Sequence, residues 1–159
     1  MLYGTGTFVL RPPVISSQLK EISVSDPPPR RWPFPIDQAE PLLVVDDQKT
    51  MVELTRRVLS RLGFENIDDA ADGYQALTLL REKKHKLVIS DLRMAAMGGI
   101  QLLKAVRADD QLKNTPFILM TGSLDVPNVL AAKYAGTDAY LLKPFTQDQL
   151  KAKLLKVLS

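Results

Sequence analysis

Short aliphatic runs alternate with amphipathic stretches along the chain from Pro41 onward. Apolar runs that are bounded by turn-forming residues are typical of strands. They predict five strands, at residues 42–46, 66–71, 86–91, 116–121 and 139–143. Three of the runs are continuously apolar, which favours central strands of a parallel sheet that is covered on both faces.

The stretches between the strands predict five helices, at residues 49–63, 73–84, 99–109, 127–136 and 146–159. Gly63 is a natural C-cap, Pro127 suits a first helical turn, and Thr146 is suited to be an N-cap. A strand–helix unit repeated five times implies an α/β fold: a parallel sheet with helices on both faces and right-handed crossovers.

The first predicted helix has apolar residues at helical spacing. Met51, Leu54, Val58 and Leu62 fall on one side of an ideal helix. We therefore expect these four side chains to form the face that packs on the sheet.

Residues 1–39 have a different composition. Eight of the 11 prolines fall in the first 41 residues, and the stretch DPPPRRWPFP (26–35) favours extended, polyproline-like geometry. We expect a Pro-rich, irregular or disordered N-terminal arm over residues 1–39, in which Trp32 could dock on the domain or on a partner. A globular domain is expected over residues 40–159.

Composition excludes several functional classes. The chain has no cysteine, so disulfides, thiolate metal sites and a cysteine nucleophile are ruled out. The net charge of +3 is spread along the chain, and the basic stretches 81–86 and 151–156 lack interleaved aromatic residues, so no nucleic-acid partner is expected. His85, among lysines, is expected to face solvent. Without a signal peptide or an apolar run of about 18 residues, we expect no membrane partner and a cytoplasmic location.

Polar residues follow the predicted strands where each strand ends. In an open parallel sheet, ligands bind outside the carboxyl ends of the strands, so these residues are the candidates for a functional site. They are Asp46 and Asp47 after the first strand, Asp91 at the end of the third, Thr121 and Gly122 after the fourth, and Lys143 and Pro144 after the fifth. Asp68, Asp69 and Asp72, near the second strand, are expected to be solvated.

These residue types point to phosphoryl chemistry with a hard metal ion. Oxygen ligands without His or Cys suit Mg²⁺. A carboxylate can also attack phosphorus and form an aspartyl phosphate, whose charge Mg²⁺, Lys143, the Thr121 hydroxyl and backbone N–H groups would offset. Two carboxylates about 5 Å apart repel each other by about 3 kcal/mol at an effective dielectric constant of about 20, and a bound cation would relieve that repulsion.

The motifs VVDDQ, ISDLRM, MTG and LLKPF occur in this order at the strand ends. In these motifs and their spacing, residues 41–159, about three-quarters of the chain, resemble the receiver domains of response regulators, in particular the stand-alone, CheY-like members. The resemblance implies a flavodoxin-like, doubly wound fold with five parallel strands in the order 2-1-3-4-5 and five helices.

The resemblance also implies a role for each site residue. Asp91 would be the phosphoacceptor. Asp47 and Asp91 would bind Mg²⁺ directly, together with the backbone carbonyl of Arg93, and Asp46 would bind it through water.

Four further residues would act on the phosphoryl group. The Thr121 hydroxyl and the Gly122 amide would bind it, and Lys143 would pair with it. The Lys143–Pro144 peptide would be cis. Tyr140 would be an aromatic switch that turns inward with Thr121 on phosphorylation.

The sequence departs from the family pattern after Asp91. A proline is usual where Ala95 stands, and an acidic residue is usual at Gly98, so we expect a looser loop here. Arg93 and Ser123 occupy positions that resemble the family's tuning sites for dephosphorylation. Neither can present a carboxylate to an attacking water, which favours slow self-hydrolysis.

The sequence therefore predicts a phosphoacceptor switch of a two-component phosphorelay. Asp91 would take a phosphoryl group from a histidine kinase or a phosphotransfer protein, and the chain would catalyse only its own phosphorylation and dephosphorylation. Because the chain ends soon after the last predicted helix, output is expected through a downstream target protein. That protein would bind the face formed by residues 127–159, with Lys133, Tyr140, Lys151 and Lys153.

Two other readings stay open. A receiver-shaped interaction module that is never phosphorylated would account for Ala95 and Gly98, but it leaves the acidic site without a purpose. A Mg²⁺-dependent phosphohydrolase with an aspartyl nucleophile fits less well, because such enzymes carry D-x-D after the first strand, whereas Asp46 and Asp47 are adjacent.

Overall fold

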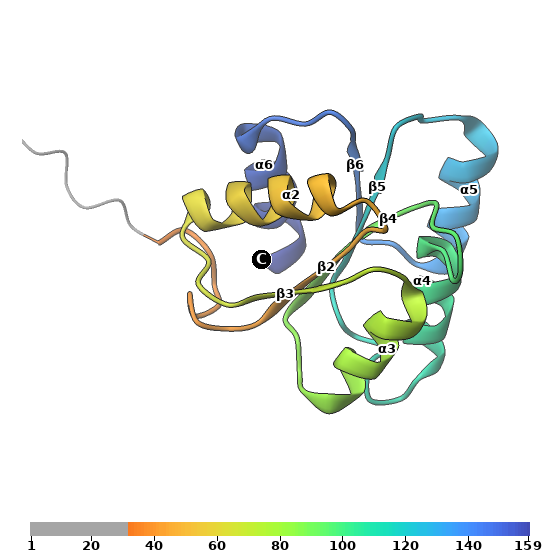
Figure 1. Ribbon diagram of the computed structural model, residues 1–159, viewed down its shortest axis with the longest axis horizontal. Helices are drawn as coiled ribbons and strands as arrows, with labels where there is room; N and C mark the ends of the chain where they lie inside the picture. Colours follow the sequence, from red (N-terminus) through yellow and green to blue (C-terminus); the bar gives the residue numbers. More distant parts are fainter. Residues whose placement is uncertain (1–31) are drawn as a thin grey trace, which may run out of the picture. The chain divides into compact units, whose positions relative to one another are not determined.

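The computed structural model describes residues 32–159, and the predictions for residues 1–31 lie outside this range. Within it, strands and helices alternate along the chain (Figure 1). They are β2 (Leu42–Val45), α2 (Lys49–Leu62), β3 (Ile67–Ala70), α3 (Gly73–Glu82), β4 (Leu87–Asp91), α4 (Gly99–Ala108), β5 (Phe117–Thr121), α5 (Val126–Ala135), β6 (Ala139–Leu142) and α6 (Gln147–Leu158). All ten elements fall where the hydrophobic pattern predicts them.

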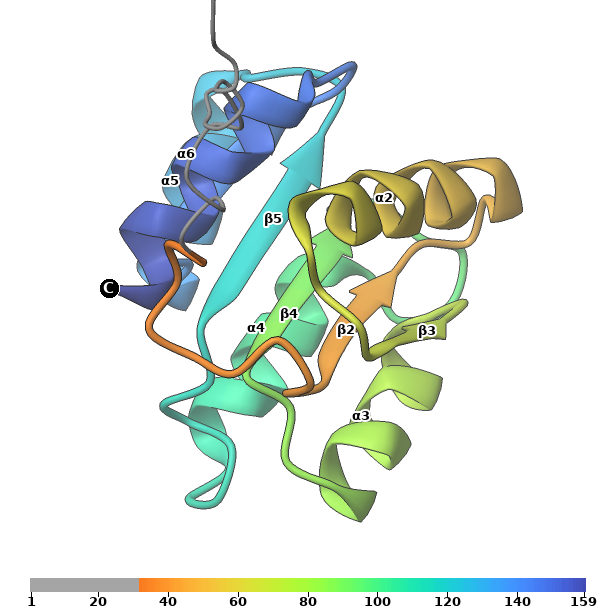
Figure 2. The same cartoon turned by 90° about the vertical axis from the view of Figure 1, so that its left-hand side faces the viewer.

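The five strands form one parallel sheet in the order β3-β2-β4-β5-β6. This order is the predicted 2-1-3-4-5. Helices α2 and α6 cover one face of the sheet, and α3, α4 and α5 cover the other (Figures 1 and 2). The doubly wound fold is therefore confirmed.

The central strands form the core. Every residue of β2, β4 and β5 is buried, whereas the edge strands β3 and β6 expose part of their length. Continuously apolar strands are the consequence of helices on both faces, because neither face of such a strand meets water. The carboxyl ends of β2, β4 and β5 are consequently held rigidly at one edge of the sheet.

The predicted helix ends are confirmed. Gly63 has a left-handed backbone with φ of 110°, and its N–H donates to the carbonyls of Leu59 and Ser60. Thr146 caps α6 by accepting a hydrogen bond from the Gln149 N–H. Pro127 lies in the first turn of α5. These caps satisfy backbone groups that the helices themselves leave without partners.

The predicted buried face of α2 is only partly right. Val58 is buried and Met51 and Leu62 are half-buried, but Leu54 is 41% exposed. The other buried residues of the helix are Val52, Thr55 and Leu59. Two apolar series at helical spacing overlap in this stretch, and they differ by one residue, which is about 100° around the helix. The structure buries the second series, with Val52 8% and Leu59 0% exposed.

The compact unit begins at Phe34 rather than at residue 40. The Phe34 ring is 4% exposed and lies with its centroid 5.0 Å from that of Phe64. The Gln38 side chain donates to the carbonyl of Gly63, and the Gln38 carbonyl accepts from the Glu65 N–H. Residues 34–39 therefore pack against the end of α2 without forming a helix or strand, which is why no periodic pattern marks them.

The expectation that His85 faces solvent is wrong. Its side chain is fully buried, with Nε2 2.7 Å from Asp68 Oδ2 and Nδ1 3.1 Å from the carbonyl oxygen of Lys83. The ammonium group of Lys83 lies 3.0 Å from the same Asp68 oxygen. Asp68 is thus engaged by two partners, whereas Asp69 forms a half-exposed ion pair with Arg56.

Both ring nitrogens of His85 lie within hydrogen-bond distance of an oxygen, Nε2 of Asp68 Oδ2 and Nδ1 of the Lys83 carbonyl. Burial by itself raises the pKa of Asp68, but the hydrogen bonds from Lys83 and His85 outweigh it and lower that pKa below its usual value. The group of His85, Asp68 and Lys83 therefore fastens the edge strand β3 to the turn before β4 with charged hydrogen bonds.

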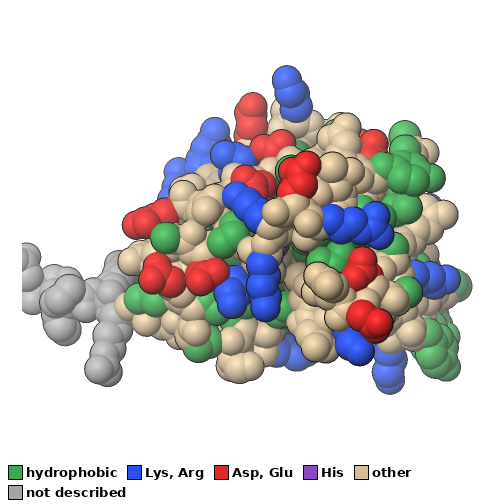
Figure 3. Space-filling view, turned by 90° about the horizontal axis from the view of Figure 1, so that it is seen from below, with side chains coloured by type: hydrophobic (Ala, Val, Ile, Leu, Met, Phe, Trp, Pro, Cys, Tyr) green, Lys and Arg blue, Asp and Glu red, His purple; other side chains and the backbone are tan. Residues whose placement is uncertain are grey.

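Surface charge is mixed on the face shown in Figure 3, where lysine and arginine side chains are interspersed with aspartate and glutamate. Such interleaving is typical of solvated helix faces. Among residues 32–159, no helix has the length and apolar character needed to span a membrane.

We predict that Asp68→Asn lowers the melting temperature at pH 7 by about 3–6 °C, because hydrogen bonds to a charged group are lost. Since the pKa of Asp68 is lowered by folding, its contribution is present above the unfolded value near 4 and is lost as the pH falls through the folded pKa. Thermal melts followed by circular dichroism between pH 2.5 and pH 7 measure this difference.

The matched control is Asp69→Asn, because the Asp69–Arg56 pair is half exposed and is expected to contribute little. Equal losses of melting temperature in the two variants at pH 7 would show that the partners of Asp68 contribute no more to stability than an exposed ion pair does.

Candidate functional site

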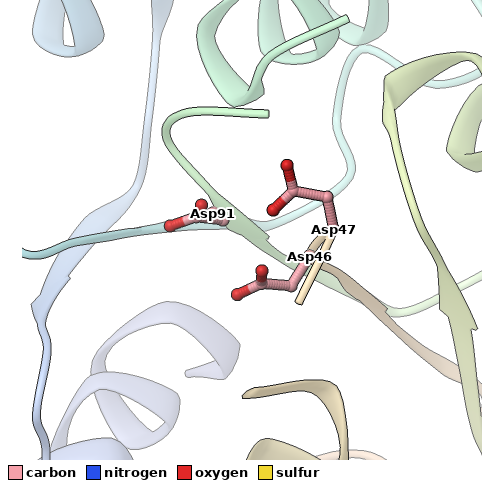
Figure 4. A group of neighbouring side chains, drawn as sticks. All are labelled: Asp46, Asp47 and Asp91. Atoms are coloured by element: carbon pink, nitrogen blue, oxygen red, sulfur yellow. The ribbon is translucent and has the colours of Figure 1, made fainter. Parts of the chain in front are cut away.

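The carboxyl edge of the sheet brings together the side chains predicted from the sequence. Asp46 and Asp47 follow β2, Asp91 ends β4, Thr121 ends β5, and Lys143 follows β6. Figure 4 shows the three aspartates converging, and one oxygen of each lies within 4.8 Å of the others. The parallel pairing of β2 with β4 places these residues on adjacent strand ends.

Asp46 is the most deeply buried of the three, with 2% of its surface exposed. Its Oδ1 accepts a hydrogen bond from the Gln48 N–H, and its Oδ2 has no hydrogen-bond partner among residues 32–159. Burial raises the pKa of Asp46 despite the bond from Gln48, and the neighbouring carboxylates of Asp91 and Asp47 raise it further. A buried carboxylate oxygen without a partner is costly, so this oxygen is suited to a bound cation.

Lys143 is the cation that faces this cluster from β6. Its Nζ lies 2.8 Å from Asp91 Oδ1 and 3.7 Å from Asp46 Oδ2. The first contact is a hydrogen bond, and the second is an ion pair at longer range. The Lys143–Pro144 peptide is cis, as the resemblance implied. One ammonium group thus meets two of the three carboxylates.

Asp47 is exposed and reaches the loop after β4. Its Oδ2 accepts a hydrogen bond from the Ala95 N–H at 3.3 Å. A proline at this position has no N–H and could not make the bond. Within the same loop, the carbonyl of Met97 accepts from the Gly73 N–H. The loop that we expected to be loose is therefore tied at two points.

Gly99 lets α4 begin directly behind the phosphoacceptor candidate. A Cβ at this position would overlap the carbonyl oxygen of Asp91. The Gly99 N–H donates to the carbonyl of Leu92 at 3.0 Å, which closes the loop. The close approach of helix and strand thus requires glycine here.

The Thr121 hydroxyl is engaged within its own loop. It donates to the carbonyl of Ser123 at 2.8 Å and accepts from the Ser123 N–H at 3.2 Å. The position of a Cβ on Gly122 is open space, so the backbone here is accessible. A Thr121 hydroxyl that binds a phosphoryl group would have to give up these local bonds.

A cavity of about 450 Å³ opens beside Asp91. It is lined by Gln48, Asp91, Leu92, Arg93, Thr121, Gly122, Ser123, Asp125 and Lys143. A larger cavity, about 620 Å³, lies beside Lys83 and His85, away from the acidic cluster. The chemistry belongs to the smaller cavity, because the carboxylate, hydroxyl and ammonium groups meet there. Arg93 lines it, and the role of its carbonyl stays a prediction.

Comparison with known proteins identifies this arrangement. Residues 42–155 match the family described as the response regulator receiver domain. The chain belongs to this family. Receiver domains are the switch modules of two-component signalling.

Relatives and solved structures agree with this assignment. The receiver domain is 40% identical over 116 residues to the chemotaxis protein CheY-3 of Vibrio cholerae, covering 73% of this chain and 89% of the relative. It is 39% identical to the chemotaxis protein CheY of Pseudomonas aeruginosa, covering 73% and 94%. The crystallised CheY4 of Vibrio cholerae has a TM-score of 0.71 and 31% identity, with 76% of this chain and 99% of that one covered.

The donor set of this receiver domain fits Mg²⁺. All three side chains offer carboxylate oxygens, which are the ligands that Mg²⁺ prefers, and no histidine or cysteine is among them. Asp46 and Asp91 are largely buried, whereas Asp47 is exposed on the loop side. A small, hard cation that keeps several waters suits a cluster with one open side.

Tyr140 is anchored away from the site. Its hydroxyl lies 2.9 Å from the carbonyl oxygen of Asn128 and 2.7 Å from that of Val129, both in the first turns of α5. Burial raises the pKa of Tyr140, and the charge of Asp125 adds to the effect. In this receiver domain the Tyr140 and Thr121 hydroxyls therefore each bond a different segment, and their coupling stays a prediction.

Asp125 and Gln48 line the cavity, and the sequence reasoning did not single out either. Asp125 is the N-cap of α5: its Oδ1 accepts from the Asn128 N–H, and its Oδ2 accepts from the Asn128 side chain. These bonds lower the pKa of Asp125, and the charge of Arg93 lowers it further. This cap could have been predicted from the sequence, because an aspartate shortly before a proline is typical of the start of a helix.

We predict that Asp46→Asn raises the melting temperature of the metal-free receiver domain at pH 7 by about 2–5 °C, because it removes a desolvated charge. The pKa of Asp46 is raised by folding, so the carboxylate destabilises the fold above that pKa. The gain should therefore shrink as the pH falls and the parent becomes protonated. Differential scanning calorimetry in EDTA, repeated with saturating Mg²⁺, checks both effects.

With saturating Mg²⁺, Asp46→Asn should melt at a lower temperature than the parent, since the variant loses a ligand of the metal. Asp47→Ala is expected to act in the same direction. A melting temperature that falls in both variants without metal would contradict the idea that the carboxylates strain each other.

We predict that Ala95→Pro strengthens Mg²⁺ binding about threefold, because loss of the Ala95 N–H frees an oxygen of Asp47 and proline stiffens the loop. Isothermal titration calorimetry measures the dissociation constant. Ala95→Gly keeps the N–H and serves as the control. Weaker Mg²⁺ binding in Ala95→Pro, or an equal gain of affinity in Ala95→Gly, would contradict the idea that the Ala95 N–H and Mg²⁺ compete for Asp47.

Proposed function

We propose that this receiver domain is a phosphoacceptor switch that takes a phosphoryl group onto Asp91 from a histidine kinase or a phosphotransfer protein. The observation that carries the proposal is the arrangement around Asp91: its Oδ1 is held by Lys143 at 2.8 Å, while the carboxylate lies in an acidic cluster beside a cavity. A carboxylate fixed in this way is prepared to attack phosphorus.

The transfer needs little more than positioning and charge. Lys143 holds Oδ1 of Asp91, and no hydrogen bond within residues 32–159 engages Oδ2, so Oδ2 is the nucleophile that we propose. The new P–O bond forms as the P–N bond to the donor imidazole breaks. Asp47, Asp91 and the Arg93 carbonyl would hold Mg²⁺ directly and Asp46 would hold it through water, and the ion would supply positive charge that offsets the three carboxylates and the phosphoryl oxygens.

Switching would follow from the new charge on Asp91. The Thr121 hydroxyl would exchange its bonds to Ser123 for a phosphoryl oxygen, together with the Gly122 N–H. Tyr140 would then leave the carbonyls of Asn128 and Val129 and turn inward. Phosphorylation would act by shifting a pre-existing equilibrium between the two arrangements.

The output surface that we propose is formed by α5, β6 and α6. Helix α5 buries only Ala132 among its own residues. Large apolar side chains are exposed on and beside it: Leu124 (52%), Val126 (68%), Leu130 (43%), Tyr134 (85%) and Leu142 (45%). Lys133 is exposed on the same helix, and Lys151 and Lys153 are partly exposed on α6. An amphipathic segment of a target protein with acidic residues would complement this surface.

A receiver-shaped module that is never phosphorylated remains the second candidate, since Ala95 and Gly98 replace residues usual in the family. The buried Oδ2 of Asp46 speaks against it. Within residues 32–159 this oxygen accepts no hydrogen bond and meets the Lys143 ammonium at 3.7 Å, and a module without ligand has no need to bury such a charge. On the first proposal, the only reactions that the chain catalyses are those of its own Asp91.

We expect the parent protein to take up one phosphoryl group per chain from an acyl phosphate in the presence of Mg²⁺, and Asp91→Asn to take up none. Intact-protein mass spectrometry measures the uptake. Asp47→Asn should slow uptake without abolishing the acceptor. A parent protein that stays unmodified with Mg²⁺ and excess donor would favour the unphosphorylated module.

A further inference from the structure

The cavity beside Asp91 must also admit the water that removes the phosphoryl group, so its lining decides how fast the signal decays. Most of the polar side chains that line the cavity are either held by hydrogen bonds or unable to accept a hydrogen bond from water. Lys143 holds Asp91, and both oxygens of Asp125 accept from Asn128. Arg93 carries only donor groups and cannot accept a hydrogen bond from water.

Gln48 lines the same cavity and is different. Its backbone is fixed: its N–H donates to Asp46 Oδ1 at 2.9 Å, and its carbonyl accepts from the N–H groups of Met51 and Val52 at the start of α2. The residue is exposed, and no hydrogen bond joins its carboxamide to any residue between 32 and 159. An anchored backbone thus carries an uncommitted carboxamide at the acidic site.

A carboxamide both accepts and donates hydrogen bonds. A side chain of this kind can orient a water for attack on phosphorus without taking a charge itself. We propose that Gln48 positions the water that hydrolyses phospho-Asp91. This inference rests on the proposed function, and it predicts faster hydrolysis than Arg93 and Ser123 alone suggest.

The step is balanced as an ordinary hydrolysis. The water oxygen forms a bond to phosphorus, and the bond between phosphorus and the Asp91 oxygen breaks. Asp91 returns to its carboxylate form, and the phosphoryl group leaves as inorganic phosphate with the second proton passing to solvent. Gln48 accepts a hydrogen bond from the water and gains no proton, so no other reactant is required.

Ser123 is the competing candidate, because it also lines the cavity and carries a hydroxyl. Its side chain is much shorter, and its N–H and carbonyl are both tied to Thr121. Comparing Gln48→Met with Ser123→Ala separates the two, since methionine keeps nearly the length of glutamine and loses the carboxamide.

The experiment loads each protein with acetyl phosphate and Mg²⁺, removes the donor, and follows loss of the phosphoryl group by mass spectrometry. Gln48→Met is expected to lose it on the order of tenfold more slowly than the parent, and Ser123→Ala within about twofold of the parent. Gln48→Glu, which keeps an oxygen at the same reach, should stay within about threefold. The rate of uptake, the Mg²⁺ dissociation constant and the melting temperature should not change in Gln48→Met.

The outcomes are distinguishable. A parent that takes up no phosphoryl group overturns the proposed function and this inference with it. A parent that is loaded, with Gln48→Met hydrolysing at the parental rate, overturns the inference alone. So does slow hydrolysis in Ser123→Ala with normal hydrolysis in Gln48→Met, or an equal slowing of uptake and hydrolysis, which would indicate a structural role.

Discussion

The repulsion among three carboxylates at the carboxyl edge of the sheet is the constraint around which the site is organised. Asp46 and Asp91 extend from central strands whose residues are all buried, so the backbone cannot move to separate them. Lys143 meets both and compensates for only part of their charge. The negative charge that remains favours the binding of a metal ion or of a proton at this site.

The loop after β4 connects the acidic cluster with helix α4. It leaves Asp91, returns a hydrogen bond to Asp47 through Ala95, and runs into α4 at Gly99, directly behind Asp91. The same loop therefore contacts the acidic cluster and leads into α4, which lies on the opposite face of the sheet from α2. Ala95, which stands where the family usually has a proline, supplies the N–H that donates to Asp47.

Local pattern was sufficient for the strands, the helices and the edge of the sheet at which the candidate residues meet, whereas the strand order came from the resemblance to receiver domains. Continuous apolar runs marked the central strands, and the motifs at their ends placed Asp91, Thr121 and Lys143 at one edge. The buried face of α2 could not be chosen in the same way, since two apolar series there compete and only the packing of Val52 and Leu59 on the sheet decides between them.

Contacts between distant residues account for the other differences. His85 has lysines as sequence neighbours, yet its partner Asp68 lies 17 residues away, on β3. Phe34 lies among prolines in the sequence, and its partner Phe64 lies beyond the first helix. Gln48 ends the VVDDQ motif, but no role was assigned to it there, and its relevance comes from the cavity that it lines. Composition and periodicity contain none of this information.

The burial of His85 has a consequence for the direction of phosphoryl flow. This is the chain's single histidine, and both of its ring nitrogens are committed to oxygen partners beneath the surface. No imidazole of this chain is therefore free to carry a phosphoryl group to or from Asp91. Under the proposed function, the phosphoryl group therefore reaches Asp91 from a donor other than His85, and the lining of the cavity beside Asp91 sets how long it stays there.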